Sequence, residues 1–533
     1  MVITVDHDNS WFTYTSSIQA ISGKIGGENK RMDIEYMIPT RKNLVLLLII
    51  TALLAACSPE ATQPPMPTES LEPPATATAL PSPTAFPTPT PTPLPLGGQQ
   101  TRYEIELTVN YYNRYIQASS RSFFTNRTSV PINEMVFVVY PAIFGNAIFI
   151  RSVRVGDSLQ QADYVWESHR MVIPLQTPLM PGDVLEIEHD FELYMPDRDG
   201  MGGVFSQTDE QLNLSYWFPM IPPYDETEGW VTHEYQTVNS YFVGEHLTFE
   251  PSDYDVILQF TDRRENFKIA AGVLPQEENG VIRYQLDLAR TFILSISDIF
   301  SLEERDVNGT KIQAFTFNAH APVGKDVADI AVQALTLFSE LYGDYERDVL
   351  SIVEFNSDIG MEFDGLIFLS PAFYNLYPGN SRSNIHVYTA HEIAHQWFFS
   401  LVGNNQALEP WLDEAFATYS ERLFYERHYP DDLDWHWDSY ILAHNPSGEI
   451  DISIYFGGTL FEYRTIVYRN GALFLHELRE TIGEEAFFSF LKDYVQRHRY
   501  EIATADDFWG TLREHTDADL TSLHNKYFTS TEE

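Results

Sequence analysis

The sequence predicts a multidomain protein with both α and β structure: an N-terminal antiparallel β domain of sandwich type, followed by a mainly helical domain. Two observations support this fold class. From about residue 101 apolar residues recur at every second position, and from about residue 323 they recur with helical spacing. A length of 533 residues and a hydrophobic content of 44 % provide for two or three domains with proper cores.

The segment around the single cysteine resembles an export signal. In RKNLVLLLIITALLAACSPE a short apolar run follows Arg41 and Lys42, and small residues precede Cys57. The run is short for a membrane span, and the small residues suit processing. Residues 37–57 therefore resemble a bacterial lipoprotein signal peptide, which implies a lipid on Cys57. The alternative is a weak membrane anchor with an incidental cysteine, and both interpretations predict export of the downstream chain.

The flanking composition sets further expectations. Residues 1–36 do not fit the short charged start of a signal peptide, so Met32 or Met37 is the more plausible first residue, and 1–36 is excluded from the predicted fold. The signal implies an extracytoplasmic protein that a lipid anchors to the bacterial cell membrane. The net charge of −43 argues against nucleic acid as a partner, because its phosphates require a basic surface.

Residues 58–98 are predicted to be a Pro/Thr-rich linker. Residues 58–95 contain 13 prolines in 38 residues, a composition that cannot form a packed core and favours extended polyproline II. At about 3.1 Å per residue such a segment reaches on the order of 100 Å. It is either a stalk that holds a working domain away from the anchor or a tether without a length requirement.

Residues 99–318 are predicted to form the antiparallel β domain. In LEIEHDFEL (185–193) apolar residues alternate with acidic ones, which predicts a strand with one buried and one solvated face. The segments 103–109, 254–260 and 280–286 show similar alternation, with turn residues between them. His189 falls on the apolar side of its strand, where a core histidine is expected rather than a metal ligand.

Residues 319–533 are predicted to form the helical domain, with the boundary near residue 318. Val327, Ile330, Ala334, Phe338 and Leu341 follow helical spacing. Further helical patterns cover residues 384–402, 411–428, 461–482 and 484–499.

The stretch TAHEIAHQWFF (389–399) contains a candidate metal site. His391 and His395 are four apart, so on a helix their imidazoles point the same way, about one turn apart. This spacing suits two ligands of one zinc ion, and Glu392 can act as general base on a water at the metal. Glu414, 19 residues after His395, can supply the third ligand. Asp413 is the alternative, but it lies on a different face of the predicted helix.

HEIAHQWF, followed after 18 residues by the glutamate of WLDEAFATY, closely resembles the aminopeptidase N family of gluzincin metallopeptidases. Asp413 stands in place of the family's usual Asn and Ala415 in place of its Gly, and neither is a ligand position. The resemblance implies a thermolysin-like zinc-peptidase domain with one Zn²⁺ per chain on His391, His395 and Glu414. It also implies peptide substrates and hydrolysis of amino-terminal residues, with Glu392 as the catalytic base.

The resemblance extends upstream to IGMEFDGLIFL (359–369), which is similar to the GAMEN-type segment of the family. It implies that Gly360 and Met361 line the cleft and that Glu362 binds the substrate's free amino terminus. A fixed carboxylate suits this task because it pairs with an ammonium group. Phe363 and Asp364 depart from the usual Asn and Trp, which leaves a solvated strand glutamate as the alternative.

Downstream, VYRNGALFLHEL resembles the family's Y-x-K-G-A helix and implies that Tyr468 donates its phenol to the developing oxyanion. Tyr463 is the alternative. Glu421, two helical turns after Glu414, is expected either to orient a histidine ligand or to lie at the surface. In the β domain, Asn213 and Gln211 are the nearest candidates for a glutamine that helps the family hold the substrate amine.

Two other functions compete with a lipid-anchored zinc aminopeptidase. One is a zinc endopeptidase or other hydrolase on the same site, favoured by Phe363 and by the absence of the family's large helical C-terminal domain. The other is a catalytically silent surface binding lipoprotein. The presence of both histidines, Glu392 and Glu414 argues against the silent form.

Overall fold

The computed structural model describes residues 100–156, 160–197, 203–238, 241–357 and 359–529. The predicted signal peptide with Cys57 and the Pro/Thr-rich linker lie outside these residues. None of the helices in the described part of the chain combines the length and the apolar character needed to cross a membrane.

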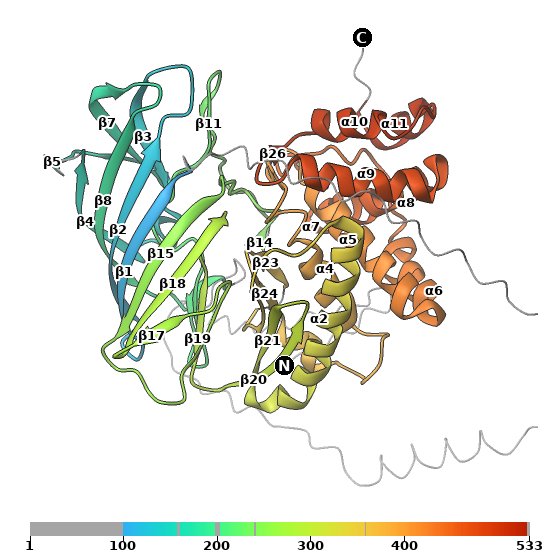
Figure 1. The fold of residues 1–533 in the computed structure, drawn as a ribbon, viewed down its shortest axis with the longest axis horizontal. Coiled ribbons are helices and arrows are strands. Elements are labelled where there is room, and N and C mark those ends of the chain that lie inside the picture. Colours follow the sequence, from blue (N-terminus) through green and yellow to red (C-terminus); the bar gives the residue numbers. More distant parts are fainter. Residues whose placement is uncertain (1–99, 157–159, 198–202, 239–240, 358, 530–533) are drawn as a thin grey trace, which may run out of the picture. The chain divides into compact units, whose positions relative to one another are not determined.

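The N-terminal domain is built on an eight-stranded sheet in the order β17-β18-β15-β1-β2-β8-β4-β5 (Figure 1). Two smaller sheets accompany it, β16-β19-β10-β9 and β3-β7-β6. The strands of the three sheets are β1 (Arg102–Asn110), β2 (Tyr115–Thr125), β3 (Ile132–Val138), β4 (Ile148–Val155), β5 (Gln160–Gln161), β6 (Val165–Glu167), β7 (Arg170–Leu179), β8 (Val184–Tyr194), β9 (Phe205–Gln207), β10 (Leu212–Leu214), β15 (Ser252–Phe260), β16 (Lys268–Ala271), β17 (Gln276–Glu278), β18 (Val281–Ala289) and β19 (Leu294–Ser297).

The alternation in the sequence sets the inner face of the large sheet. Tyr103, Ile105, Leu107 and Val109 of β1 are buried, and the residues between them are exposed or half-buried. The sheet is not antiparallel throughout, because β1 pairs with β15 in parallel. A parallel neighbour requires a long connection, and the chain between β1 and β15 supplies one by building strands β2 to β10 first.

The polar face of β8 is less solvated than its pattern predicts. Glu188 and Glu192 are only 9 % exposed, because arginines of the neighbouring strands cover them. Arg121 of β2 lies 3.2 Å from Glu188, and Arg151 of β4 lies 2.6 Å from Glu192. His189 faces the core, as the pattern predicts, with its ring 4.5 Å from that of Phe137.

The C-terminal half of the chain begins with a five-stranded sheet, β20-β21-β22-β24-β23. Its strands are β20 (Phe300–Val307), β21 (Thr310–Phe317), β22 (Val349–Glu354), β23 (Met361–Phe363) and β24 (Leu366–Leu369). Strands β20 and β21 precede residue 318, so this sheet crosses the boundary predicted there. Helices α2 and α4 pack on one face of it, while apolar side chains of β22, β23 and β24 also join the core of the β domain.

Helices dominate the remaining C-terminal part of the described chain (Figure 1). Helix α5 covers the predicted range 411–428, whereas α4 ends eight residues earlier than predicted because the chain turns at His395. The helices are α2 (Ala321–Tyr342), α3 (Pro371–Asn375), α4 (Asn384–Ala394), α5 (Trp411–His428), α6 (Leu433–His436), α7 (Leu460–Arg464), α8 (Gly471–Ile482), α9 (Glu484–Arg497), α10 (Ala505–Arg513) and α11 (Thr521–Tyr527). Two π-helical turns, Trp437–Ile441 and Thr465–Asn470, follow α6 and α7.

Short strand pairs complete the fold. They are β11 (Tyr224–Asp225) with β12 (Gly229–Trp230), β13 (Thr237–Val238) with β14 (Tyr241–Phe242), and β25 (Gly403–Asn404) with β26 (Ile502–Ala503). The first two pairs belong to the connection between β10 and β15, and the segment from residue 231 to residue 247 contacts both halves of the molecule. The ring of His246 lies 5.9 Å from that of His169 in the β domain, and the Tyr455 hydroxyl donates to the carbonyl oxygen of Glu234.

Candidate metal centre and active site

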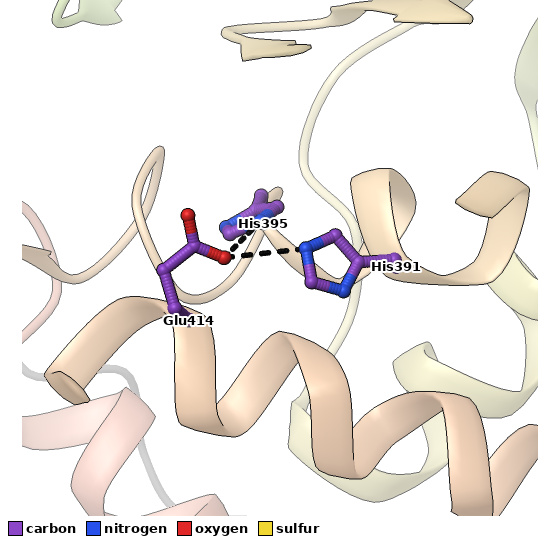
Figure 2. Close-up of side chains that lie close together, drawn as sticks. All are labelled: His391, His395 and Glu414. Carbon is purple, nitrogen blue, oxygen red and sulfur yellow. Dashed lines mark ion pairs between the residues drawn. The ribbon is translucent and has the colours of Figure 1, made fainter. Parts of the chain in front are cut away.

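Helices α4 and α5 bring the three predicted metal ligands together. His391 lies in the last turn of α4, His395 caps its C-terminal end one turn further on, and Glu414 lies in the first turn of α5. Oε2 of Glu414 is 3.2 Å from Nε2 of His391 and 3.6 Å from Nε2 of His395 (Figure 2). All three side chains are buried. The ligand set predicted from the sequence is thus assembled at one point, with one nitrogen of each imidazole directed at the carboxylate.

The other nitrogen of each imidazole is held by a carboxylate. Nδ1 of His391 donates to Glu421 at 2.8 Å, and Nδ1 of His395 donates to Asp413 at 2.6 Å. These bonds fix the tautomer that leaves each Nε2 free to bind a metal. Asp413, the alternative ligand, therefore supports a ligand instead of acting as one. Glu421 is buried and holds His391, so it does not lie at the surface, which was the alternative.

The three residues fit a zinc ion. Within the described part of the chain, Nε2 of His395 and Oε2 of Glu414 are buried without a hydrogen-bond partner. Zinc–ligand distances of about 2.0–2.1 Å in a tetrahedral site separate neighbouring ligand atoms by about 3.3 Å, which agrees with the 3.2 and 3.6 Å found here. Two imidazole nitrogens and one carboxylate oxygen also match the ligand chemistry of catalytic zinc.

Glu392 lies beside this centre, against the backbone of Gly360. A Cβ atom on Gly360 would lie 2.0 Å from Oε1 of Glu392, so only glycine allows the chain to pass so close. The Glu392 carboxylate, Glu362 and His395 have polar atoms within 4.8 Å of one another. Burial raises the pKa of Glu392 to about 7, against the lowering effect of the two nearby histidines.

The edge strand β23 presents Glu362 to the metal centre. Its neighbour Phe363 points the other way and packs against Tyr216 and Phe368 in the β-domain core. Successive side chains of a strand point to opposite faces, which explains why Phe363 is in the core although Glu362 before it faces the site. Gly360 and Met361 are half-buried at the start of the same strand. Gln396, next to His395, fixes this region by accepting from Gly365 N and donating to Phe363 O, both at 2.9 Å.

Asp364 ties the two domains together behind β23. Its carboxylate accepts from the backbone N–H groups of Arg290 and Thr291, both at 3.0 Å, on the β-domain side. On the catalytic side it accepts from Arg347 at 3.0 Å and from Ser400 at 2.6 Å. The residue that stands in place of the family's usual tryptophan therefore has a structural task.

A second carboxylate, Glu245, joins Glu362 and was not predicted from the sequence. Glu245, Glu362 and Asp413 have oxygen atoms within 4.8 Å of one another, and Gln406 donates to both Glu245 and Asp413. Burial, reinforced by the neighbouring carboxylates, raises the pKa of Glu245 to about 8. Glu245 follows β14 in an irregular segment, where no periodicity or motif distinguishes it.

The residues considered in its place, Asn213 and Gln211, are not brought to this site. Asn213 donates to the carbonyl oxygen of Gly203 and accepts from Ser295. Gln211 donates to Ser295 and to the carbonyl oxygen of Glu354. Both side chains are buried, and their polar groups are occupied by these partners.

Tyr468 is the tyrosine that reaches the metal ligands. Its hydroxyl donates to Oε1 of Glu414, and its ring stacks on that of His391 with centroids 6.0 Å apart. It lies in the π-helical turn Thr465–Asn470, a type of helix irregularity that is frequent at functional sites. Tyr463, the alternative, is buried with its hydroxyl against Gly244.

Two histidines one turn apart, a glutamate from the next helix and a second glutamate beside them have the residue pattern of a gluzincin metallopeptidase site. Comparison with known proteins agrees. Residues 328–455 and 457–527 match the peptidase family M1 domain. Over these residues the chain is therefore similar to peptidase family M1.

Several curated aminopeptidases are similar in sequence to part of this chain. Aminopeptidase M1-A of Oryza sativa subsp. japonica is 26 % identical over 267 residues, which cover 45 % of this chain and 30 % of that protein. Aminopeptidase N of Lactobacillus helveticus is 29 % identical over 250 residues, covering 41 % of this chain and 28 % of the relative. The chain thus matches less than a third of the length of these two proteins.

Solved structures show the same two-domain fold. A mutant M1 zinc metallopeptidase from Deinococcus radiodurans has a TM-score of 0.56 at 17 % identity, covering 82 % of this chain and 97 % of the other. The same mutant bound to a Tyr-Ser-Ala substrate has a TM-score of 0.55 at 18 % identity, with the same coverage. At this level of identity the solved structures support the fold alone. The family that the sequence resembles implies Zn²⁺ as the metal of the site.

Proposed function

We propose that the chain is a zinc-dependent aminopeptidase that removes amino-terminal residues from peptides outside the cytoplasm. The observation that supports an exopeptidase is the pair of carboxylates, Glu362 and Glu245, beside the metal centre. Oε1 of Glu362 is buried and has no hydrogen-bond partner within the described residues. An unpaired buried carboxylate oxygen is unfavourable until a cation reaches it, and a peptide's terminal ammonium supplies that cation.

In this proposal each residue of the site has a task in the reaction. Zinc, when bound, supplies the Lewis acidity that polarises a carbonyl oxygen and acidifies water. Glu362 and Glu245 bind the substrate ammonium and so place the first peptide bond at the site. Glu392 accepts the proton of the attacking water and passes it to the leaving amine. Tyr468 donates its hydroxyl to the carbonyl oxygen as negative charge develops there.

Substrates with free and acetylated amino termini test this assignment on the soluble fragment that starts at residue 99. The wild-type enzyme should cleave the free peptide and leave the acetylated one intact. Equal cleavage of both would favour a zinc endopeptidase on the same site, and no cleavage of either by the zinc-loaded protein would favour a silent binding protein.

Two variants separate the proposed roles. Glu392→Gln should lower kcat by about 10²-fold or more while zinc stays bound, because the base is lost and the ligands remain. Glu362→Gln should instead raise KM by about tenfold or more and weaken the discrimination against acetylated peptides, because the charge that pairs with the ammonium is lost. An unchanged KM for the Glu362 variant would contradict the ammonium site.

We also propose that the mature protein begins at a lipid-modified Cys57 that anchors it to the bacterial membrane. The support is the apolar run and the small residues before this cysteine, all of which lie outside the described residues. In the full chain, Cys57→Ser should yield an active protein that no longer partitions with membranes. Stable membrane retention of this variant would show that the apolar segment itself is the anchor.

A further inference from the structure

Glu421 uses both oxygens of its carboxylate on histidines. Oε1 accepts from Nδ1 of the metal ligand His391, and Oε2 accepts from Nε2 of His436, each at 2.8 Å. Glu421 and His391 are 4 % and 5 % exposed, and His436 is not exposed at all. A continuous line of buried hydrogen bonds therefore runs from the metal centre to His436, at the end of helix α6.

The ring of His436 is fixed from both sides. It stacks on Tyr425 with centroids 4.7 Å apart and an interplanar angle of 13°, and on Tyr440 at 5.5 Å and 19°. Tyr440 donates its hydroxyl to Asn384, the first residue of α4, and Tyr425 donates to the carbonyl oxygen of Ser381, just before that helix. The same helix carries His391 and is capped by His395, so the ring is held in register with the metal centre.

We infer that His436 is a positioning residue of the metal centre, which acts through Glu421 on His391. A glutamate whose carboxylate is bonded at one oxygen only can still turn about its last torsion, which is broad. The bond from His436 fixes the second oxygen and therefore the plane of the carboxylate. The first oxygen is then aimed at Nδ1 of His391, which holds this imidazole in the tautomer and orientation that the metal requires.

The bond also removes an electrostatic penalty. Without His436, Oε2 of Glu421 would be a buried, charged oxygen without a donor, and the carboxylate would have to turn or take up a proton. Either change would weaken its bond to His391. The inference rests on the proposed zinc site, because the benefit to His391 is realised when its Nε2 binds a metal.

Zinc affinity is the measurement that tests this role, with competition against a chromophoric chelator on the purified fragment from residue 99. His436→Phe keeps an aromatic ring between Tyr425 and Tyr440 but removes the N–H donor. It should raise the zinc Kd roughly tenfold, the lower end of the range for partners of metal ligands. His436→Gln restores an N–H donor and should recover part of this loss. His476→Phe serves as the matched control, because His476 packs against Tyr419 and Trp437 without touching Glu421.

A purely structural role would give a different pattern. It would lower the unfolding temperature of the metal-free protein in the Phe and Gln variants alike and leave no rescue of zinc affinity by Gln. That result, or a His436→Phe variant that binds zinc within about twofold of the wild type, overturns the inference, since a lost partner of a metal ligand should have a larger effect. A wild-type protein that binds no zinc would instead refute the proposed function itself.

Discussion

The contact between Gly360 and Glu392 provides a direct test of how catalysis depends on the position of one carboxylate. The change is Gly360→Ala, which adds a single methyl group to the strand that passes over the catalytic glutamate. The backbone of Gly360 does not require a positive φ, so alanine is compatible with its conformation. Any loss of activity should therefore come from the contact between the added methyl group and the Glu392 carboxylate.

The structure gives the size of the perturbation. The added Cβ would lie 2.0 Å from Oε1 and 2.8 Å from Cδ of Glu392, whereas real Cβ contacts stay above 3.0 Å. The carboxylate must therefore move by about 1 Å or more, and displacements of about this size lower catalytic rates on the order of 10²-fold. Because the atom that must move is the end of a flexible side chain, the fold itself should be little affected.

The assay is steady-state hydrolysis of a peptide with a free amino terminus, together with zinc content and thermal unfolding. Gly360→Ala should lose about 10²-fold in kcat, keep its zinc and unfold near the wild-type temperature. Gly510→Ala is the control, since Gly510 lies in helix α10 with no atom within 4 Å of an added Cβ, and this variant should be as active as the wild type. A Gly360→Ala enzyme with wild-type kcat would refute the role given to the position of Glu392.

Three further predictions concern the metal, the domain contact and acid stability. Glu414→Ala should lose most of its zinc, because two imidazoles are an incomplete ligand set, and full occupancy by metal analysis would contradict the assignment. Asp364→Ala leaves Arg347 without its buried partner and should destabilise the protein by about 3–5 kcal/mol in urea unfolding; a loss below about 1 kcal/mol would show that the domain contact is unimportant. Burial against Phe137 lowers the pKa of His189 to about 3, so below pH 6.5 the unfolded chain takes up a proton that the native state does not, which removes about 2 kcal/mol of stability by pH 5. His189→Leu should reduce the difference in unfolding free energy between pH 7 and pH 5 by that amount, and an unchanged difference would show that His189 is not the group responsible.

The metal site was predictable because its ligands are local in sequence. A spacing of four on one helix places His391 and His395 together whatever the rest of the fold does, and the glutamate follows at a short, fixed distance. The same holds for strands whose alternation reports one buried face, such as β1 and β18. Glu362 and Tyr468 were found through motifs, and the structure places both beside the ligands.

Other features depend on contacts between distant segments. Glu245 reaches Glu362 from a connection that shows no periodicity, and His436 reaches Glu421 from a short helix whose sequence carries no motif. Strand β1 pairs in parallel with β15, and β20 and β21 belong to the sheet of the second half of the chain. Alternation predicts that a segment is a strand and which face is buried, but it does not predict which strand lies beside it.

By itself, the sequence determined the fold class and predicted a candidate site of two histidines with Glu414 and Glu392, because helical and strand periodicities act over a few residues. Only the tertiary structure decided that Asp413 bonds to Nδ1 of His395 while Glu414 faces Nε2 of both histidines, since both carboxylates of the Asp413–Glu414 pair were chemically competent ligands. It also decided which tyrosine meets Glu414 and which carboxylate joins Glu362. The physical reason is that these outcomes depend on the direction of a side chain across a packed interface, and that direction is set by neighbours far away in the chain.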